Sequence, residues 1–70
     1  MSIQTGDTVQ WDWGNGTGTG KVTQIYTQKI TKTIKGAEVT RDADDDAPAF
    51  LIEQDDGDHV LKSCTEVQKA

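Results

Sequence analysis

Cysteine, histidine and proline each occur once in the 70 residues of this chain, and long apolar runs are missing. A lone Cys64 cannot form an internal disulfide, and Cys64 with His59 cannot complete a zinc site. No run approaches the roughly 18 apolar residues that span a membrane. Residues 1–15 also lack the basic start and apolar stretch of a signal peptide. We therefore expect a cytoplasmic, monomer-capable protein that has no cofactor.

Side chains suited to catalysis or metal binding are equally scarce. His59 follows Asp58, but no nucleophile stands at a defined spacing from them. The acidic stretches at residues 42–46 and 55–58 lack the alternating oxygen ligands and final glutamate of a calcium-binding loop. The sequence therefore predicts no enzyme and no metal site.

The glycine-rich stretch "WDWGNGTGTGKV", residues 11–22, invites comparison with a phosphate-binding loop. A dinucleotide fingerprint that starts at Gly14 would need glycine where Thr19 stands, and a P-loop would need serine or threonine where Val22 stands. The residues that follow also predict a strand, so no helix N-terminus would face an anion. The phosphate-loop interpretation fails.

What the chain does contain is alternation typical of strands. Val9, Trp11 and Trp13 alternate with polar residues, the pattern of a half-buried strand. In "GKVTQIYTQKITKTI" the apolar phase slips between Val22 and Ile25, which indicates a bend or bulge. "KGAEV", with a turn at Gly36 and a short strand around Val39, "PAFLIEQ", "HVLK" and a last short strand at Val67 complete the set. The prediction is one all-β domain over residues 1–70, a small SH3-like or Tudor-like barrel of about five antiparallel strands. Residues 1–5 and 68–70 are expected to be flexible ends.

Glycine positions predict the turns. Asn15-Gly16 and Asp56-Gly57 are dipeptides typical of two-residue hairpin turns in which both φ angles are positive. Gly18 and Gly20 lie in phase within the second strand, where a missing side chain would let the wall bend or pack against a tryptophan. The predicted core residues are Val9, Trp11, Val22, Ile25, Phe50, Ile52, Val60 and Val67.

The Trp-x-x-Gly-x-Gly opening, "IKGAEVTR" and "PAFLIEQDDGDHVLK" resemble the bacterial hypervirulence-associated Tudor-domain family in order and spacing. The resemblance covers nearly the whole chain and implies a Tudor-like, SH3-like barrel, but little about activity. Phe50 stands where a related branch usually carries tyrosine. Lys62-Ser63 stands where a more distant branch has His-Lys, so a role for that histidine does not transfer.

Tudor domains elsewhere often bind methylated lysine or arginine in a cage of aromatic side chains, through cation–π attraction. A cage made of Trp11, Trp13, Tyr26 and Phe50 would leave no aromatic residue for the core, and Trp11 has the inward parity. We therefore predict a shallower groove for a peptide or protein partner, lined by Trp13 and Tyr26 and flanked by Phe50. The alternative is that Trp13 and Tyr26 close one end of the barrel.

Charge is unevenly distributed along the chain. Residues 21–41 carry a net charge of +4 and residues 42–58 a net charge of −8. Residues 42–46 are expected to form a mobile acidic rim that favours a basic partner. The second functional hypothesis is an accessory barrel that binds nucleic acid through Lys21, Lys29, Lys32 and Lys35. The overall charge of −5 repels phosphate at long range, which makes this the weaker hypothesis.

Overall fold

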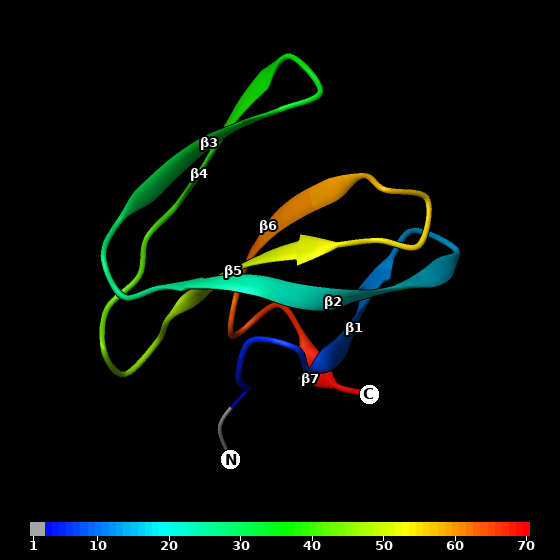
Figure 1. Ribbon diagram of the computed structural model, residues 1–70, viewed down its shortest axis with the longest axis horizontal. Coiled ribbons are helices and arrows are strands. Elements are labelled where there is room, and N and C mark those ends of the chain that lie inside the picture. The colour runs from blue at the N-terminus through cyan, green and yellow to red at the C-terminus, as the bar shows by residue number, and fades with distance from the viewer. Residues whose placement is uncertain (1–2) are drawn as a thin grey trace.

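The computed structural model describes residues 3–70, apart from the side chain of Trp13, and within that range the chain forms strands and no helix. Figure 1 shows twisted strands packed together in one small molecule. Its longest dimension is 31 Å. The strands are β1 (Thr8–Trp13), β2 (Gly16–Tyr26), β3 (Ile30–Ile34), β4 (Ala37–Arg41), β5 (Ala49–Glu53), β6 (His59–Ser63) and β7 (Gln68–Lys69).

Five of the strands form one antiparallel sheet in the order β6-β5-β2-β1-β7. The long strand β2 is its centre: the first half pairs with β1 and the second half with β5. This sheet confirms the predicted all-β fold of about five antiparallel strands. Residues 68–69, expected to belong to a flexible end, form β7 and pair with β1, while residues 1–2 lie outside the described part of the chain.

The core lies inside the bend of this sheet. Its buried cluster is Val9, Trp11, Val22, Phe50 and Ile52, all of which belong to the predicted core. The other predicted core residues, Ile25, Val60 and Val67, pack against this cluster but are only partly buried. Leu61, which the sequence did not assign to the core, is also buried, with 2% of its surface exposed.

The predicted phase slip in the second strand is a β-bulge. The register of β2 against β5 shifts between Val22 and Gln24, and the hydroxyl of Thr23 donates to the carbonyl of Leu51 over 3.1 Å. Because a bulge adds one residue to one strand, the residues after it change face. The stretch from Gly20 to Ile34, whose sequence predicted a bent or bulged strand, forms two strands: residues 27–29 separate β2 from β3.

Both predicted hairpin turns differ in detail from the structure. Trp13 pairs with Gly16, so the first loop consists of Gly14 and Asn15, one residue earlier than predicted. Gly14 has a φ of 48°, and among the described residues Lys35 is the only non-glycine residue with positive φ. A positive φ at the first central position alone is the type II′ pattern, so the prediction of a type I′ turn at Asn15-Gly16 is wrong.

The turn between β5 and β6 has three central residues and not two. The amide of Gln54 donates to the carbonyl of Asp58 over 2.7 Å, and the amide of Gly57 donates back to Gln54 over 2.9 Å. Gly57 has a φ of 88° but Asp56 does not have positive φ. Glycine in the left-handed region after a turn is typical of a three-residue hairpin loop with a bulge, which corrects the predicted two-residue turn.

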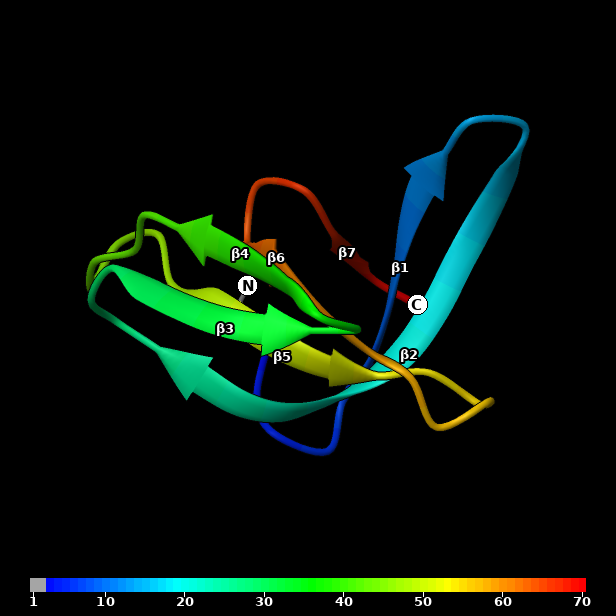
Figure 2. The same cartoon turned by 90° about the horizontal axis from the view of Figure 1, so that it is seen from above.

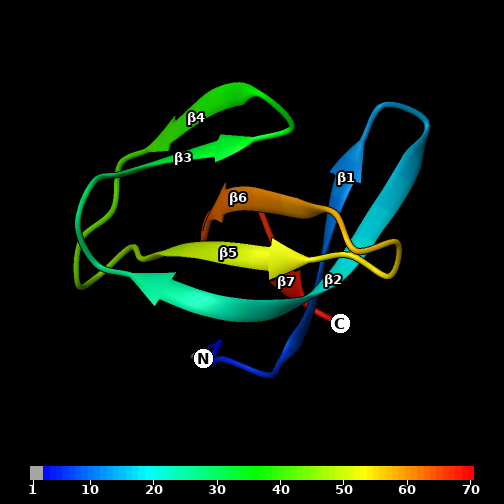
Figure 3. The same ribbon diagram turned by 45° about the horizontal axis from the view of Figure 1, so that its top comes forward.

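The β3–β4 hairpin forms a second sheet that folds over the outer face of β5 and β6 (Figure 3). Lys35 and Gly36 make its turn, with φ angles of 51° and 79°. Half-buried and exposed residues alternate along β3, so one side of the hairpin is directed to the main sheet. This cover explains why Leu61 is buried although it faces away from the core cluster.

Candidate functional site

Phe50, the predicted flank of the aromatic groove, is part of the core. It lies in the middle of β5 opposite Ile25 of β2, and 1% of its surface is exposed. It is nevertheless one of the residues that line a hollow at the surface. Phe50 is therefore a buried residue beside this hollow and not an exposed flank of a groove.

Tyr26 lies on the other face of the sheet from Phe50. It is the last residue of β2, opposite Ala49, and therefore directly follows the pair formed by Ile25 and Phe50. Successive side chains of a strand point to opposite faces. The half-buried Tyr26 faces β3 of the hairpin, with Nζ of Lys32 at 5.3 Å from the ring centroid. The two residues do not line one groove.

Trp13 belongs to a different end of the molecule. It pairs with Gly16, the first residue of β2, whereas Tyr26 is the last residue of that strand. The predicted role of the Trp13 side chain lies outside the described part of the structure. The main-chain positions of Trp13 and Tyr26, which were predicted to line one groove, therefore lie at opposite ends of β2. The bulge after Val22 adds a second difference, because it removes the shared parity on which the prediction for Tyr26 depended.

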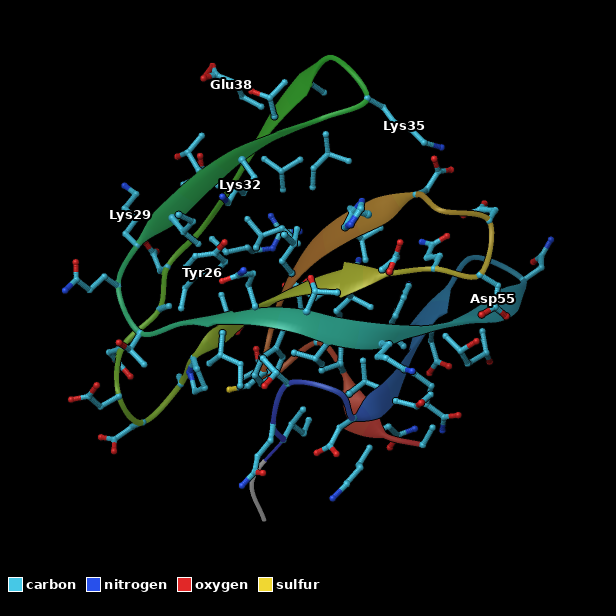
Figure 4. All side chains as sticks on the ribbon, viewed as in Figure 1. Tyr26, Lys29, Lys32, Lys35, Glu38 and Asp55 are labelled. Atoms are coloured by element: carbon cyan, nitrogen blue, oxygen red, sulfur yellow. The ribbon has the colours of Figure 1, made fainter. Side chains whose placement is uncertain are left out.

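The four lysines of the nucleic-acid hypothesis do not form one basic face. Lys21 lies opposite Glu53 in the sheet, and Lys32 is half-buried over the ring of Tyr26. Lys35 is paired with Asp58 at 2.6 Å, at the far end of the hairpin from Lys29 (Figure 4). Two of the four cations are therefore occupied within the chain itself, which weakens their use as phosphate ligands.

A hollow of about 420 Å³ next to Phe50 combines apolar walls with acidic residues. We call it the Phe50 groove. Its walls come from segments that are far apart in the sequence, including the residues before β1, the loop before β5 and the turn before β7. It is lined by Ile3, Asp45, Asp46, Pro48, Phe50, Cys64, Val67, Gln68 and Lys69.

The acidic rim of the Phe50 groove is held in place by Asp44. A carboxylate oxygen of Asp44 accepts hydrogen bonds from the amides of Asp46, at 2.9 Å, and Ala47, at 2.7 Å. The main chains of Asp44 and Ala47 also bond to each other in both directions. This turn leaves the side chains of Asp45 and Asp46 exposed at the groove. Residues 44–46 of the stretch expected to form a mobile rim thus belong to a hydrogen-bonded turn.

Sequence reasoning assigned Phe50 and Val67 of the groove to the core but missed Ile3 and Cys64. Both lie outside the strands and are only partly buried, so no periodic pattern marks them. The cation in the groove, Lys69, is directed toward Asp7, with 3.6 Å between Nζ and a carboxylate oxygen. The balance of charge at the groove is therefore acidic.

An ion pair connects the β3–β4 hairpin to the turn before β7, beside the Phe50 groove. Nε of Arg41 donates to Glu66 over 2.8 Å, and Glu66 also accepts a hydrogen bond from the amide of Ser63 over 2.8 Å. Partial burial alone would raise the pKa of Glu66, but the hydrogen bonds from Ser63 and Arg41 outweigh it and hold that pKa below its usual value. Glu66 thus links the hairpin to the turn before β7.

We expect Glu66→Gln to lower the free energy of unfolding at neutral pH by about 0.5–1 kcal/mol, since the pair is partly exposed. A carboxyl whose pKa is lowered on folding stabilises the folded state above its ordinary pKa of 4.5, and this contribution is lost as the pH falls below it. Urea unfolding of both proteins at several pH values measures the difference, which should shrink on acidification. Glu38→Gln, at an exposed position, is the matched control; an equal effect there would contradict the role of Glu66.

Within the described part of the chain, no group of three or more histidine, cysteine or acidic side chains is arranged to hold a metal ion. Residues 3–70 also contain no helix that is long and apolar enough to cross a membrane.

Comparison with known proteins gives one match, to a family model. The model described as hypervirulence associated proteins TUDOR domain matches residues 6–67. No curated protein and no solved structure matches the chain. The matched range includes every strand from β1 to β6 and the apolar residue Val67 that precedes β7.

Proposed function

The chain belongs to the family of hypervirulence-associated Tudor domains, and we propose that it is a non-enzymatic interaction module that binds a basic peptide or protein segment in the Phe50 groove. Tudor-like domains are typically small and non-catalytic, and they generally bind proteins or peptides. The observation that carries the proposal is the meeting of an apolar hollow with two exposed carboxylates, those of Asp45 and Asp46.

The Phe50 groove suits a partner with an apolar side chain next to a cation. Ile3, Cys64 and Val67 leave part of their surface exposed around the buried ring of Phe50, so an apolar side chain in the groove would lose water contact on several sides. The turn at Asp44 fixes the acidic rim before binding, which lowers the entropy cost of association. The cation of the partner would face Asp45 and Asp46.

NMR titration of the labelled protein with a short synthetic peptide of lysine and valine tests this proposal. We expect amide shifts of Asp46, Phe50 and Val67, and about a tenfold loss of affinity in the variant Asp45→Asn/Asp46→Asn, because two carboxylates at the rim are removed. The matched control is Asp55→Asn/Asp56→Asn, which makes the same change of net charge in the β5–β6 turn.

Equal losses in the two variants would show that the peptide responds only to the net charge, and the groove would be rejected. The nucleic-acid alternative is tested in the same way with single-stranded DNA. If it were correct, binding would weaken steeply with salt and with Lys29→Ala, while the aspartate variants would strengthen it.

A further inference from the structure

Strand β2 has an edge that nothing in the sheet covers. Its pairing with β5 begins only at Lys21, so residues 16–20 pair with β1 on one side and have no strand on the other. Figure 2 shows the corresponding part of β1 and β2 extending away from the rest of the molecule as a two-stranded ribbon. The open side of this ribbon, from Gly16 to Gly20, is called the β2 edge below.

The hydrogen bonds at the base of the ribbon show which main-chain groups point outward. The amide of Val22 donates to Asp7 over 2.9 Å, and its carbonyl accepts from Gly6 over 2.8 Å, so the main chain of Val22 faces the β1 side. These groups alternate in direction along a strand. The N–H and C=O groups of Thr17 and Thr19 therefore point away from β1, and no described strand pairs with them.

The β2 edge is short, but it lacks the charged residues, proline and bulge that usually keep strand edges apart. Exposed edges are commonly protected by lysine, proline or a bulge. The segment from residue 14 to residue 20 reads GNGTGTG, without a charged residue or a proline, in a chain of net charge −5. The bulge of β2 comes later, after Val22. Two copies could thus approach each other along this segment without direct charge repulsion.

We propose that a second copy of this chain pairs with the β2 edge, forming a symmetric antiparallel dimer whose two-fold axis passes through Gly18. In this register Thr17 lies opposite Thr19 of the second copy. Both residues direct their N–H and C=O groups outward, so each such pair can exchange two hydrogen bonds. The arrangement uses the same surface on both copies, as a two-fold interface requires.

A hollow at the end of the β2 edge would face the Gly14–Asn15 turn of the second copy. The same register brings Gly16 of the second copy opposite Gly20, so its Gly14–Asn15 turn comes next to Lys21, where the pairing with β5 begins. A polar hollow of about 440 Å³ lies there, lined by Thr8, Thr19, Gly20, Lys21, Glu53, Gln54, Asp55 and Gly57. The Gly14–Asn15 turn is small and uncharged, and its amide side chain can bond to Gln54 or Asp55.

Sedimentation velocity at protein concentrations into the millimolar range tests the dimer. We expect the native chain to shift toward the dimer as its concentration rises, and the variant Thr17→Lys/Thr19→Lys to remain monomeric. In the dimer the introduced lysines stand directly opposite each other, which is destabilising. In the monomer the first of them faces Asp12 across the β1–β2 ladder, so the fold is retained. Circular dichroism checks this retention.

Charge pairing gives an independent readout. The variant Thr17→Glu/Thr19→Glu should also be monomeric alone, whereas an equal mixture of the two variants should form a heterodimer through opposite charges. Thr33→Lys, an exposed position on β3, is the control and should leave dimerisation unchanged. A native chain that stays monomeric throughout, a dimer equally sensitive to Thr33→Lys, or a mixture that does not associate would overturn the proposal.

Discussion

Trp11→Ala is expected to leave the domain largely unfolded at room temperature. Trp11 is 5% exposed and belongs to the buried cluster with Val9 and Phe50. Removing a buried tryptophan costs about 3–5 kcal/mol through lost burial and the cavity left behind. A chain of this length buries a small core, which rarely supplies more than about 3–5 kcal/mol of stability. Far-UV circular dichroism and urea unfolding measure the loss.

The contact between Trp11 and Gly18 provides the control. These residues lie opposite each other in the β1–β2 ladder, and a Cβ atom on Gly18 would stand 2.6 Å from Cε2 of the indole ring. Gly18→Ala should therefore destabilise the native chain but cost much less in a Trp11→Leu background, where the ring is absent. An equal cost in both backgrounds would mean that the ring does not lie over Gly18.

Strand positions could be read from the sequence because they depend on local alternation. Val9 and Trp11 share a parity that places both in the core, and Phe50 and Ile52 do the same in β5. The prediction that Gly18 makes room for a tryptophan also holds, since the ring of Trp11 fills that space. A side chain that alternates with polar neighbours needs no long-range information to be assigned to one face.

Turn geometry was harder to predict, because the same glycine can serve more than one loop length. Asn15-Gly16 fits a type I′ turn, but Gly14 offers a second glycine one residue earlier, and pairing of Trp13 with Gly16 selects it. At Gly57, the hydrogen bond from Gln54 to Asp58 closes a longer loop than the dipeptide indicates. The register of the whole hairpin decides between such turns.

The placement of Tyr26 beside Phe50 could not be predicted for a related reason. Parity placed Tyr26 with Val22, but the bulge between Val22 and Gln24 moved it to the other face. The sequence showed that the phase slips there, yet not which residue is the extra one. Leu61 was missed because its cover, the β3–β4 hairpin, comes from a distant part of the chain. Tertiary contacts of this kind leave no local pattern.

The acidic rim and Phe50 can be identified from the sequence, but their meeting in one groove cannot. Composition alone identified residues 42–46 as acidic and Phe50 as a candidate. Only the structure brings the two together with Ile3 and Val67 in one hollow. The proposed site therefore keeps the predicted preference for a basic partner but moves it from the Tyr26 face to the opposite face of the sheet.

Gly20→Ala is expected to have the second largest effect, although it adds only one methyl group. A Cβ atom at Gly20 would stand 2.5 Å from Cγ2 of Ile52 and 2.7 Å from the main-chain carbonyl oxygen of Glu53. Ile52 is fully buried, and the carbonyl of Glu53 belongs to β5, so neither atom can move without displacing the strand. Overpacking of this kind costs about 1–3 kcal/mol and sometimes more.

Replacing a glycine also raises the free energy of unfolding, but by less than the overpacking lowers it. Alanine lowers the entropy of the unfolded chain and stabilises by about 0.4–1 kcal/mol where the folded backbone accepts it. Gly20 does not have positive φ, so the backbone itself would accept alanine, and the clash alone decides the sign. Urea unfolding should show a clear loss for Gly20→Ala and a change within about 0.5 kcal/mol for Thr19→Ala, at the exposed neighbouring position. If Gly20→Ala were as stable as the native chain, β5 could not lie as close to β2 at this point as the structure has it.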